Sequence, residues 1–430
     1  MIRRICSLLL CGAAVLVSSC QTPQGIPLLR VEEVLHEPVI RVRVAVREHK
    51  ASTDGQTIVR IAPTGEPGLA VTGPVHIGMS GATLVIRGPK GDPVLRSAKP
   101  IRLSSEDGRP LRIGASGYPG VIVVHPRPDA GGFDIVNHVP IEQYLPGVLD
   151  RELYATWRPS TFEAQAIAAR SYAIARLART RSRHYDLEST QASQVYGGTT
   201  SNRKALHAVE RTRGQLLAYD GFVVPAYYSS CTGGYGQDAA AAFPNGPDMP
   251  PLRGRVHGYW GRKSPKFQWG PVARDRGALA RRLASWGRAH RHDIANLKRI
   301  HNVRVSSRNS VGRVAGFVVV GDEGRIFDIG PESFRHACNY APAGMALAAD
   351  QRLFSSHVRV TVAGGRVHFT DGRGYGHGVG MGQFGAQAMA MAGHTAPAIL
   401  AFYYPGAAIE RVYPAEGPGR AGSSVRLSWR

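Results

Sequence analysis

The sequence is short of cysteine, of acidic residues and of long apolar runs, and each shortage narrows the class of protein. Only 5 of 430 residues are cysteine, which excludes a fold held together by many disulfides. The apolar run at residues 8–17 is too short to span a bilayer as a helix. Acidic residues number 31 against 53 basic ones, which gives a formal net charge of +22 and favours anionic partners.

Much of the basic excess lies between residues 253 and 313. Wall polymers and lipid head groups are anionic partners that such a surface would attract, and a solvated basic face is the alternative interpretation. Nucleic acid is not expected as a partner, because no stacking motif and no helix-turn-helix spacing accompany the charge.

The first 19 residues are typical of a bacterial secretion signal. Two arginines precede the apolar run and two serines precede Cys20, an arrangement similar to the lipobox after which a cysteine is lipidated. We therefore expect a lipoprotein signal peptide at residues 1–19, a lipid anchor at Cys20 and a tether at residues 20–34. A plain secretory signal is the alternative. The predicted location is the cell envelope, outside the cytoplasm and attached to a membrane.

Two cysteines, Cys231 and Cys338, would remain after signal removal and lipidation. An oxidising compartment makes them candidates for a disulfide. Separate buried thiols, or one thiol that ligates a metal, are the alternatives.

The body of the chain alternates between strand and helix patterns. Short runs such as VIRVRVAV and VIVVHP, separated by Gly, Pro and Asp, predict a β-rich part over residues 39–136. A long helix is expected after Ser160, with Glu163 completing a capping box. Strands return from residue 301.

These patterns predict an α+β fold that is β-rich with a few helices. We expect one large domain over residues 35–412 and a flexible tail at residues 413–430, because the chain has no long low-complexity linker.

Seven glycines surround His377 between residues 372 and 385, in the sequence GRGYGHGVGMGQFG. Glycine is unfavourable inside regular elements, so this density favours a loop that presents groups to a ligand. A dinucleotide site is excluded, because no apolar strand precedes the glycines and no acidic residue occurs from residue 384 to 409.

Three segments together resemble the SpoIID/LytB family, the stage II sporulation protein D and amidase-enhancer group of bacterial envelope proteins. They are YLPGVLDRELYATW with EAQAIAARSYA, then AYYSSCTGGYG, then GYGHGVGMGQFGAQAMA with YYPG, and they are spread from Tyr144 to Gly406. The resemblance implies a SpoIID-like domain that acts on peptidoglycan glycan strands. Its sporulation branch implies a lytic transglycosylase for peptide-stripped strands, with one catalytic glutamate.

That glutamate matches Glu152, and a surface charge beside Arg151 is the alternative. A carboxyl group can protonate a glycosidic oxygen near neutral pH only if its surroundings raise its pKa. In a lytic transglycosylase the muramoyl 6-hydroxyl is the nucleophile, so one carboxyl group suffices. A hydrolase would need a second carboxylate about 5 to 9.5 Å away, for which Asp150 and Glu142 are the candidates.

Five further residues in these segments are candidates for substrate binding: Arg170, Tyr172, Gln165, His377 and Gln383. Arg170 would position sugar or orient the catalytic acid, and a structural ion pair is the alternative. Tyr172 would stack on a sugar face. The other three would donate or accept hydrogen bonds, with ordinary structural roles as the alternative.

No metal and no cofactor are expected. Sporulation members often carry a histidine and a serine ahead of Gly-Gly, where this chain has Ser229 and Ser230. Cys231 with His377 or His336 would then be an incomplete zinc ligand set.

Two other functions remain open at this point. The first is a non-catalytic peptidoglycan-binding module that enhances a separate amidase, which would then be a partner. The second is an envelope scaffold that docks through the basic stretch at residues 253–313.

Overall fold

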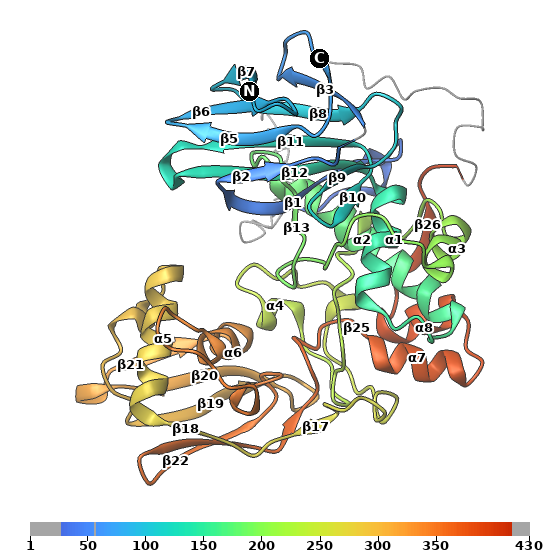
Figure 1. Ribbon diagram of the computed structural model, residues 1–430. Helices are drawn as coiled ribbons and strands as arrows, with labels where there is room; N and C mark the ends of the chain where they lie inside the picture. Colours follow the sequence, from blue (N-terminus) through green and yellow to red (C-terminus); the bar gives the residue numbers. More distant parts are fainter. Residues whose placement is uncertain (1–26, 56, 415–430) are drawn as a thin grey trace, which may run out of the picture.

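The computed structural model describes residues 27–55 and 57–414. The predicted signal peptide, Cys20, the first part of the tether and almost all of the predicted tail lie outside these residues. Within them the chain forms eight α-helices and mixed sheets (Figure 1). The prediction of a β-rich α+β fold is therefore confirmed. None of the helices described is both long enough and apolar enough to cross a membrane.

The N-terminal part is built from sheets, drawn in blue and teal at the top of Figure 1. Alternate residues of its strands are buried, as Val59 and Ile61 are in β3, because successive side chains point to opposite faces. The seven-stranded sheet has the order β13 (Leu187–Glu188), β1 (Val39–Glu48), β12 (Gly132–Pro140), β11 (Val121–Arg127), β8 (Ile101–Ser105), β3 (Ile58–Pro63) and β4 (Leu69–Thr72).

Two smaller sheets accompany the large one. The four-stranded sheet has the order β2 (Lys50–Ser52), β5 (His76–Ser80), β6 (Thr83–Arg87) and β7 (Pro93–Ser97), and a hairpin pairs β9 (Leu111–Ile113) with β10 (Ser116–Tyr118).

Three helices follow the sheets: α1 (Ile141–Glu152), α2 (Pro159–Thr180) and α3 (Arg203–Arg211). The predicted capping box at the start of α2 is wrong. Proline occupies the first helical position, Arg158 is the N-cap, and no side chain caps the helix. The Glu163 carboxylate instead accepts a hydrogen bond from Arg211 of α3 at 2.8 Å.

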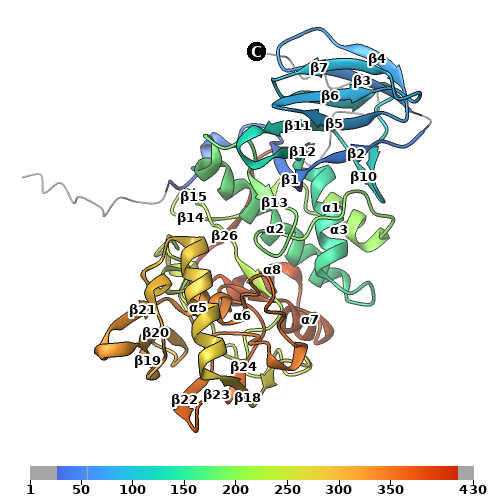
Figure 2. The same ribbon diagram turned by 60° about the vertical axis from the view of Figure 1, so that its left-hand side comes forward.

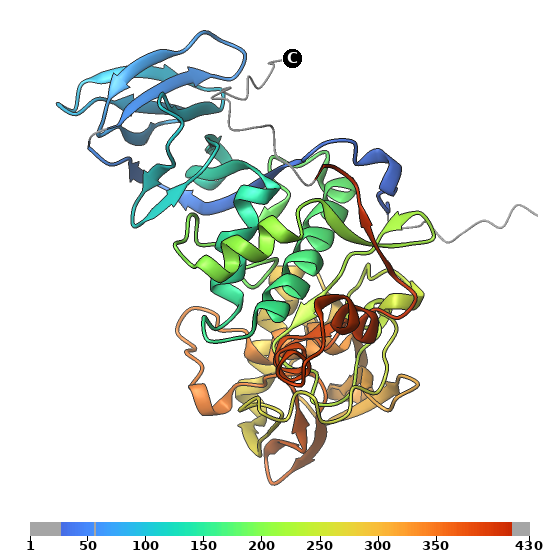
Figure 3. The same ribbon diagram turned by 90° about the vertical axis from the view of Figure 1, so that its right-hand side faces the viewer.

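The C-terminal helices α7 (Gln383–Met391) and α8 (Ala396–Tyr403) pack against α2. In Figure 3 these red helices lie beside the green helices of the middle of the chain. The parallel pair of β16 (Tyr228–Ser229) and β25 (Met381–Gly382) leads directly into α7. β14 (Gln215–Tyr219) lies between β15 (Phe222–Val223) and β26 (Ala408–Arg411), and α4 (Ala239–Ala242) follows β16 in the chain.

Residues 269–369 have a hydrophobic core of their own and are called the inserted lobe below. The lobe is drawn in yellow and orange, below the sheets, in Figures 1 and 2. Its two helices are α5 (Arg276–His290) and α6 (Pro331–Asn339). One of its sheets has the strand order β19 (Asn302–Arg308), β20 (Val314–Val320) and β21 (Ile326–Ile329). The other has the order β18 (Val272–Asp275), β23 (Arg366–Thr370) and β22 (Arg359–Ala363). At its border β17 (Gln268–Trp269) pairs with β24 (Gly372–Arg373).

Three residues before residue 35 contact the body of the protein. Leu29 and Val34 are buried in the core, and Val31 donates a backbone hydrogen bond to Gly221. The last residues of the predicted tether therefore pack against the body of the protein.

Candidate functional site

Glu152 is the last residue of α1, and its carboxylate is held from two sides. Oε1 accepts the backbone N–H of Val195 at 3.0 Å, and Oε2 accepts the side-chain amide of Gln383 at 3.1 Å. The side chain is half-buried. The structure thus joins two residues that the sequence separates by 231 positions, and the alternative of a free surface charge does not hold.

Burial raises the pKa of the Glu152 carboxyl above its usual value. The two hydrogen bonds act in the opposite direction because they favour the ionised form, but burial is the larger effect. The position at the carboxyl end of a helix also disfavours a negative charge. A larger fraction of Glu152 is therefore protonated near neutral pH than of an exposed glutamate.

The second and third motif segments reach Glu152 through the pairing of β16 with β25. Tyr228 is paired with Met381, and the N–H of Phe384 donates to the carbonyl of Ser230 at 3.0 Å. This pairing places Gln383, the first residue of α7, beside the end of α1.

The buried side-chain amide of Gln194 supports the same region through three hydrogen bonds. The Gln194 side chain accepts a hydrogen bond from the Tyr144 hydroxyl at 3.0 Å and donates one to the Tyr228 hydroxyl at 3.1 Å. It also donates to the carbonyl of Ala169 at 3.2 Å. The next residue in the chain is Val195, so this network fixes the backbone that binds Glu152.

Three aromatic side chains gather just beyond the end of α1, among the residues that follow Glu152 and Gln383 in the chain. Ring centroids are 5.3 Å apart for Tyr154 and Trp157, 5.2 Å for Trp157 and Phe384, and 6.1 Å for Tyr154 and Phe384. Tyr154 is 61% exposed. Phe384 was not predicted as a site residue, although it directly follows Gln383 in the glycine-loop motif. The cluster offers an aromatic surface on which a sugar face can pack.

Both candidate second carboxylates are bound to groups other than Glu152. Asp150 lies two residues before Glu152, on a different face of α1, and accepts a hydrogen bond from Asn202 at 2.9 Å. Glu142 lies ten residues earlier, about 15 Å along the helix. Its carboxylate is already bound by Arg170, Tyr413 and Gly214.

Arg170 is a structural ion-pair partner, which was one of its two predicted roles. Its side chain is fully buried, and it donates to both oxygens of Glu142, at 2.9 and 2.7 Å. A further bond runs to the carbonyl of Gln215 at 3.0 Å. Arg170 therefore contacts neither Glu152 nor the surface.

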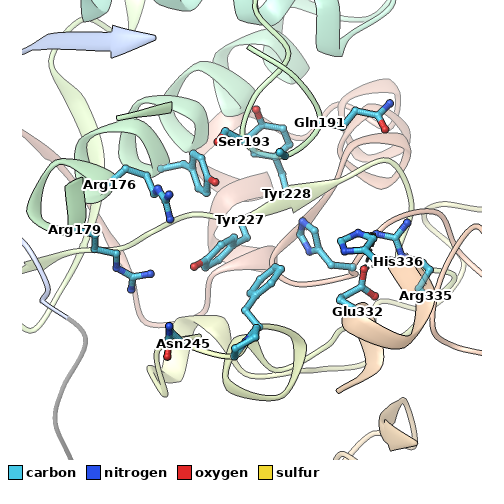
Figure 4. A pocket seen from close by; sticks show the side chains of 15 residues that line it. Arg176, Arg179, Gln191, Ser193, Tyr227, Tyr228, Asn245, Glu332, Arg335 and His336 are labelled. Carbon is cyan, nitrogen blue, oxygen red and sulfur yellow. Dashed lines mark hydrogen bonds and ion pairs between the residues drawn. The ribbon is translucent and has the colours of Figure 1, made fainter. Parts of the chain in front are cut away.

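The other candidate binding residues do not lie together. Gln383 contacts Glu152, whereas Tyr172 and His377 line a separate pocket of about 360 Å³ (Figure 4). Burial lowers the pKa of His377 to about 4, so its imidazole is neutral at pH 7. Gln165 is fully buried, and neither atom of its amide has a hydrogen-bond partner among the residues described.

The glycine loop is held by an arginine that the sequence did not single out. Arg313 of the inserted lobe is fully buried and donates to the carbonyls of Thr232 at 2.9 Å, Tyr235 at 2.8 Å and His377 at 3.1 Å. Gly378 has φ +76° and lies against this guanidinium group, so a Cβ atom there would collide with it. The glycine content of the loop is thus explained in part by close packing on Arg313.

Cys231 and Cys338 are both buried free thiols, so the predicted disulfide is not formed. The Cys231 thiol contacts the loop around Gly261, whereas Cys338 lies in the core of the inserted lobe. The alternative of separate buried thiols holds. Among residues 27–55 and 57–414, no group of three or more His, Cys, Asp or Glu side chains is arranged to hold a metal ion.

The sequence around the converging segments matches a known family of proteins. The SpoIID family model, described as stage II sporulation protein, matches residues 129–219, which include Glu152 and Val195. The relatives below agree with this match. Together they confirm the predicted resemblance to the SpoIID/LytB family.

Individual relatives come from both branches of the family. The chain is 28% identical over 290 residues to the amidase enhancer of Bacillus subtilis (strain 168), covering 61% of this chain and 39% of that protein. It is 28% identical over 291 residues to the stage II sporulation protein D of the same organism, covering 64% and 75% of the two chains. The corresponding protein of Bacillus amyloliquefaciens is 26% identical over 287 residues, covering 63% and 74%. The chain thus spans well under half of the amidase enhancer and about three quarters of the sporulation proteins.

Proposed function

We propose that this protein acts on the bacterial cell wall as a lytic transglycosylase that cleaves peptidoglycan glycan strands. The observation that carries the proposal is the Glu152 carboxyl, whose pKa burial raises and which both Gln383 and Val195 hold. The names of the relatives, stage II sporulation protein D and amidase enhancer, support a role at the wall.

One carboxyl group can perform both proton transfers of this reaction. Protonated Glu152 donates its proton to the glycosidic oxygen as the bond from that oxygen to the anomeric carbon breaks. The resulting carboxylate is stabilised by the donors on Val195 and Gln383. It then accepts the proton of the muramoyl 6-hydroxyl, whose oxygen attacks the anomeric carbon and closes a 1,6-anhydro ring. Water is not consumed, and the enzyme returns to its starting protonation state.

The aromatic cluster of Tyr154, Trp157 and Phe384 would bind the strand next to the acid. Because Tyr154 is largely exposed, a sugar ring can reach it without any rearrangement of the core. The location that fits this substrate is the envelope, and we propose that the chain is exported and anchored there through lipidated Cys20.

The experiment that tests the proposal is mass spectrometry of the products formed from peptide-stripped glycan strands. We expect 1,6-anhydromuramoyl ends with the unchanged protein and none with Glu152→Gln. Asp150→Asn is the matched control, since it removes a neighbouring carboxylate that faces Asn202; it should retain activity. Ordinary reducing ends would refute the transglycosylase and indicate hydrolysis.

The second candidate is a non-catalytic module that binds glycan and enhances an amidase, and the amidase-enhancer relative favours it. Under this hypothesis both the unchanged protein and Glu152→Gln would leave glycan intact, and both would bind it. Addition of either protein to an amidase would then raise the rate of stem-peptide release from whole peptidoglycan.

A further inference from the structure

A pocket of about 360 Å³ lies between α2, the strand β16 and α6 of the inserted lobe. Glu152 does not line it, but the two places adjoin. Ser193 lies in the pocket wall, and Val195, two residues further along the chain, binds the Glu152 carboxylate. Two residues of chain span at most about 7 Å.

Two arginines on α2 give this pocket an unbalanced positive charge. Arg176 and Arg179 are three residues apart, nearly one helical turn, and lie along one side of the pocket, opposite Arg335, His336 and Glu332 (Figure 4). Neither of the two α2 arginines forms an ion pair within the described residues. Buried nitrogens on both, Nε of Arg176 and Nη2 of Arg179, have no hydrogen-bond partner there.

The remaining charges of the pocket do not offset these two. Glu332, the one acidic residue in the lining, is 2.7 Å from Arg335 and accepts a hydrogen bond from Ser356 at 2.9 Å. Three arginines against one glutamate leave a formal charge of +2, with the histidines neutral. Unpaired charges that are partly removed from water are costly, so an anion is the ligand that this side of the pocket favours.

The floor of the pocket is aromatic. Tyr227 stacks on Phe243 with a centroid distance of 4.7 Å, and Tyr172 meets Tyr227 edge-on at 5.6 Å. Such a surface suits the apolar face of a sugar ring better than a small inorganic ion. The pocket therefore combines a place for a ring with a place for a carboxylate, which an arginine can bind through two parallel hydrogen bonds.

We propose that this pocket binds a muramoyl residue, with Arg176 and Arg179 on its lactyl carboxylate and Tyr227 against its ring. The inference rests on the proposed function, because a glycan strand stripped of its peptides exposes this carboxylate on its muramoyl residues. The inference gives a physical reason why the pocket would favour strands without stem peptides. A strand that still carries stem peptides has the lactyl group in an amide bond, and so lacks the charge at this position.

The test measures binding of monosaccharides to the full chain by calorimetry, which requires no cleavage. N-acetylmuramic acid carries the lactyl group with its carboxylate, and N-acetylglucosamine is the same sugar without the lactyl group. We expect the first to bind at least about tenfold more tightly, and Arg176→Gln or Arg179→Gln to remove about tenfold of that preference. Arg181→Gln is the matched control, since it removes one exposed charge next to the end of the same helix and should keep the preference.

Equal binding of the two sugars would overturn the inference, and so would a preference that survives in both variants. N-acetylmuramoyl-L-alanine tests the source of the carboxylate, because its acid group is displaced by one residue. Tighter binding of this compound would assign the pocket to stem peptide and overturn the lactyl assignment. Competition by inorganic phosphate alone, with no preference between the sugars, would likewise refute it.

The outcome is distinguishable from a failure of the proposed function. Glycan cleavage without any preference for N-acetylmuramic acid would leave the transglycosylase standing and remove the pocket assignment. A preference that depends on Arg176, in a protein that cleaves no glycan, would keep the pocket and favour the binding module.

Discussion

Breaking the buried ion pair between Arg170 and Glu142 should destabilise the protein strongly and leave the proposed chemistry of Glu152 untouched. The Arg170 side chain has no exposed surface and that of Glu142 is 5% exposed. The pair is bidentate, at 2.9 and 2.7 Å. The perturbations are Arg170→Met, Glu142→Leu and the double variant.

The structure sets the expected size of each effect. A single replacement leaves the other charge buried without its partner, which costs about 3–5 kcal/mol in the free energy of unfolding. The double variant removes both charges. It still leaves the Gly214 N–H and the Tyr413 hydroxyl without their acceptor, and each such loss costs about 1–3 kcal/mol. The double variant should therefore lose less than the sum of the single ones, with a coupling energy of about 0.5–3 kcal/mol.

Urea unfolding of the full chain, followed by circular dichroism, measures these differences. Arg211→Gln is the matched control, because it breaks an Arg–Glu pair whose arginine is 73% exposed and should cost less than about 1 kcal/mol. Cleavage of glycan by the folded double variant should stay close to that of the unchanged protein. A stable Arg170→Met variant that has lost only glycan binding would refute this reasoning and make Arg170 a sugar ligand.

Three further predictions concern the acid and the thiols. Glycan cleavage should fall as pH rises through the pKa of Glu152. Gln383→Met should move that fall to higher pH, because the hydrogen bond that it removes favours the carboxylate. A shift of the pH profile of kcat/KM to lower pH would contradict this. Because the pKa of folded Glu152 is raised, its charge opposes folding above that pKa. Glu152→Gln should therefore melt at a higher temperature than the unchanged protein at pH 8 and at the same temperature at pH 4, and a lower melting temperature at pH 8 would be inconsistent with the burial described. Since Cys231 and Cys338 are free thiols, a reductant should not change the midpoint of urea unfolding. Burial raises the pKa of Cys338 to about 12, so a thiol reagent should modify Cys338 only after unfolding. A midpoint that depends on the reductant would show that the two cysteines form a disulfide after all.

The sequence predicted the parts of the fold that depend on local patterns. Period-two alternation is a property of each strand, so the β-rich N-terminal part followed from it directly. The capping box at Ser160 failed because two nearby effects outweighed it. Pro159 fixes the first turn of α2, and the carboxylate of Glu163 is drawn to Arg211 on a helix that sequence spacing cannot place.

The candidate site was predictable only as far as its motifs reach. The resemblance placed Glu152 and Gln383 in the same family pattern, but their contact depends on the pairing of β16 with β25. The roles of two buried arginines were not decided by sequence. Arg170 fits either of its predicted roles until Glu142 is seen beside it, and Arg313 belongs to a basic stretch in which composition distinguishes no member.

The long separation between Glu152 and Gln383 has a consequence for how the protein is made. These two residues are 231 positions apart, and contacts between distant parts of a chain form late because their loop-closure entropy must be overcome first. During synthesis, 231 residues, more than half of the chain, are added after Glu152 by the time Gln383 is present. Until α7 docks on α2, the carboxyl group lacks one of its two donors and the cluster around Trp157 lacks Phe384. An incomplete chain therefore holds an unfinished site, and the site becomes complete only when almost the whole chain has folded.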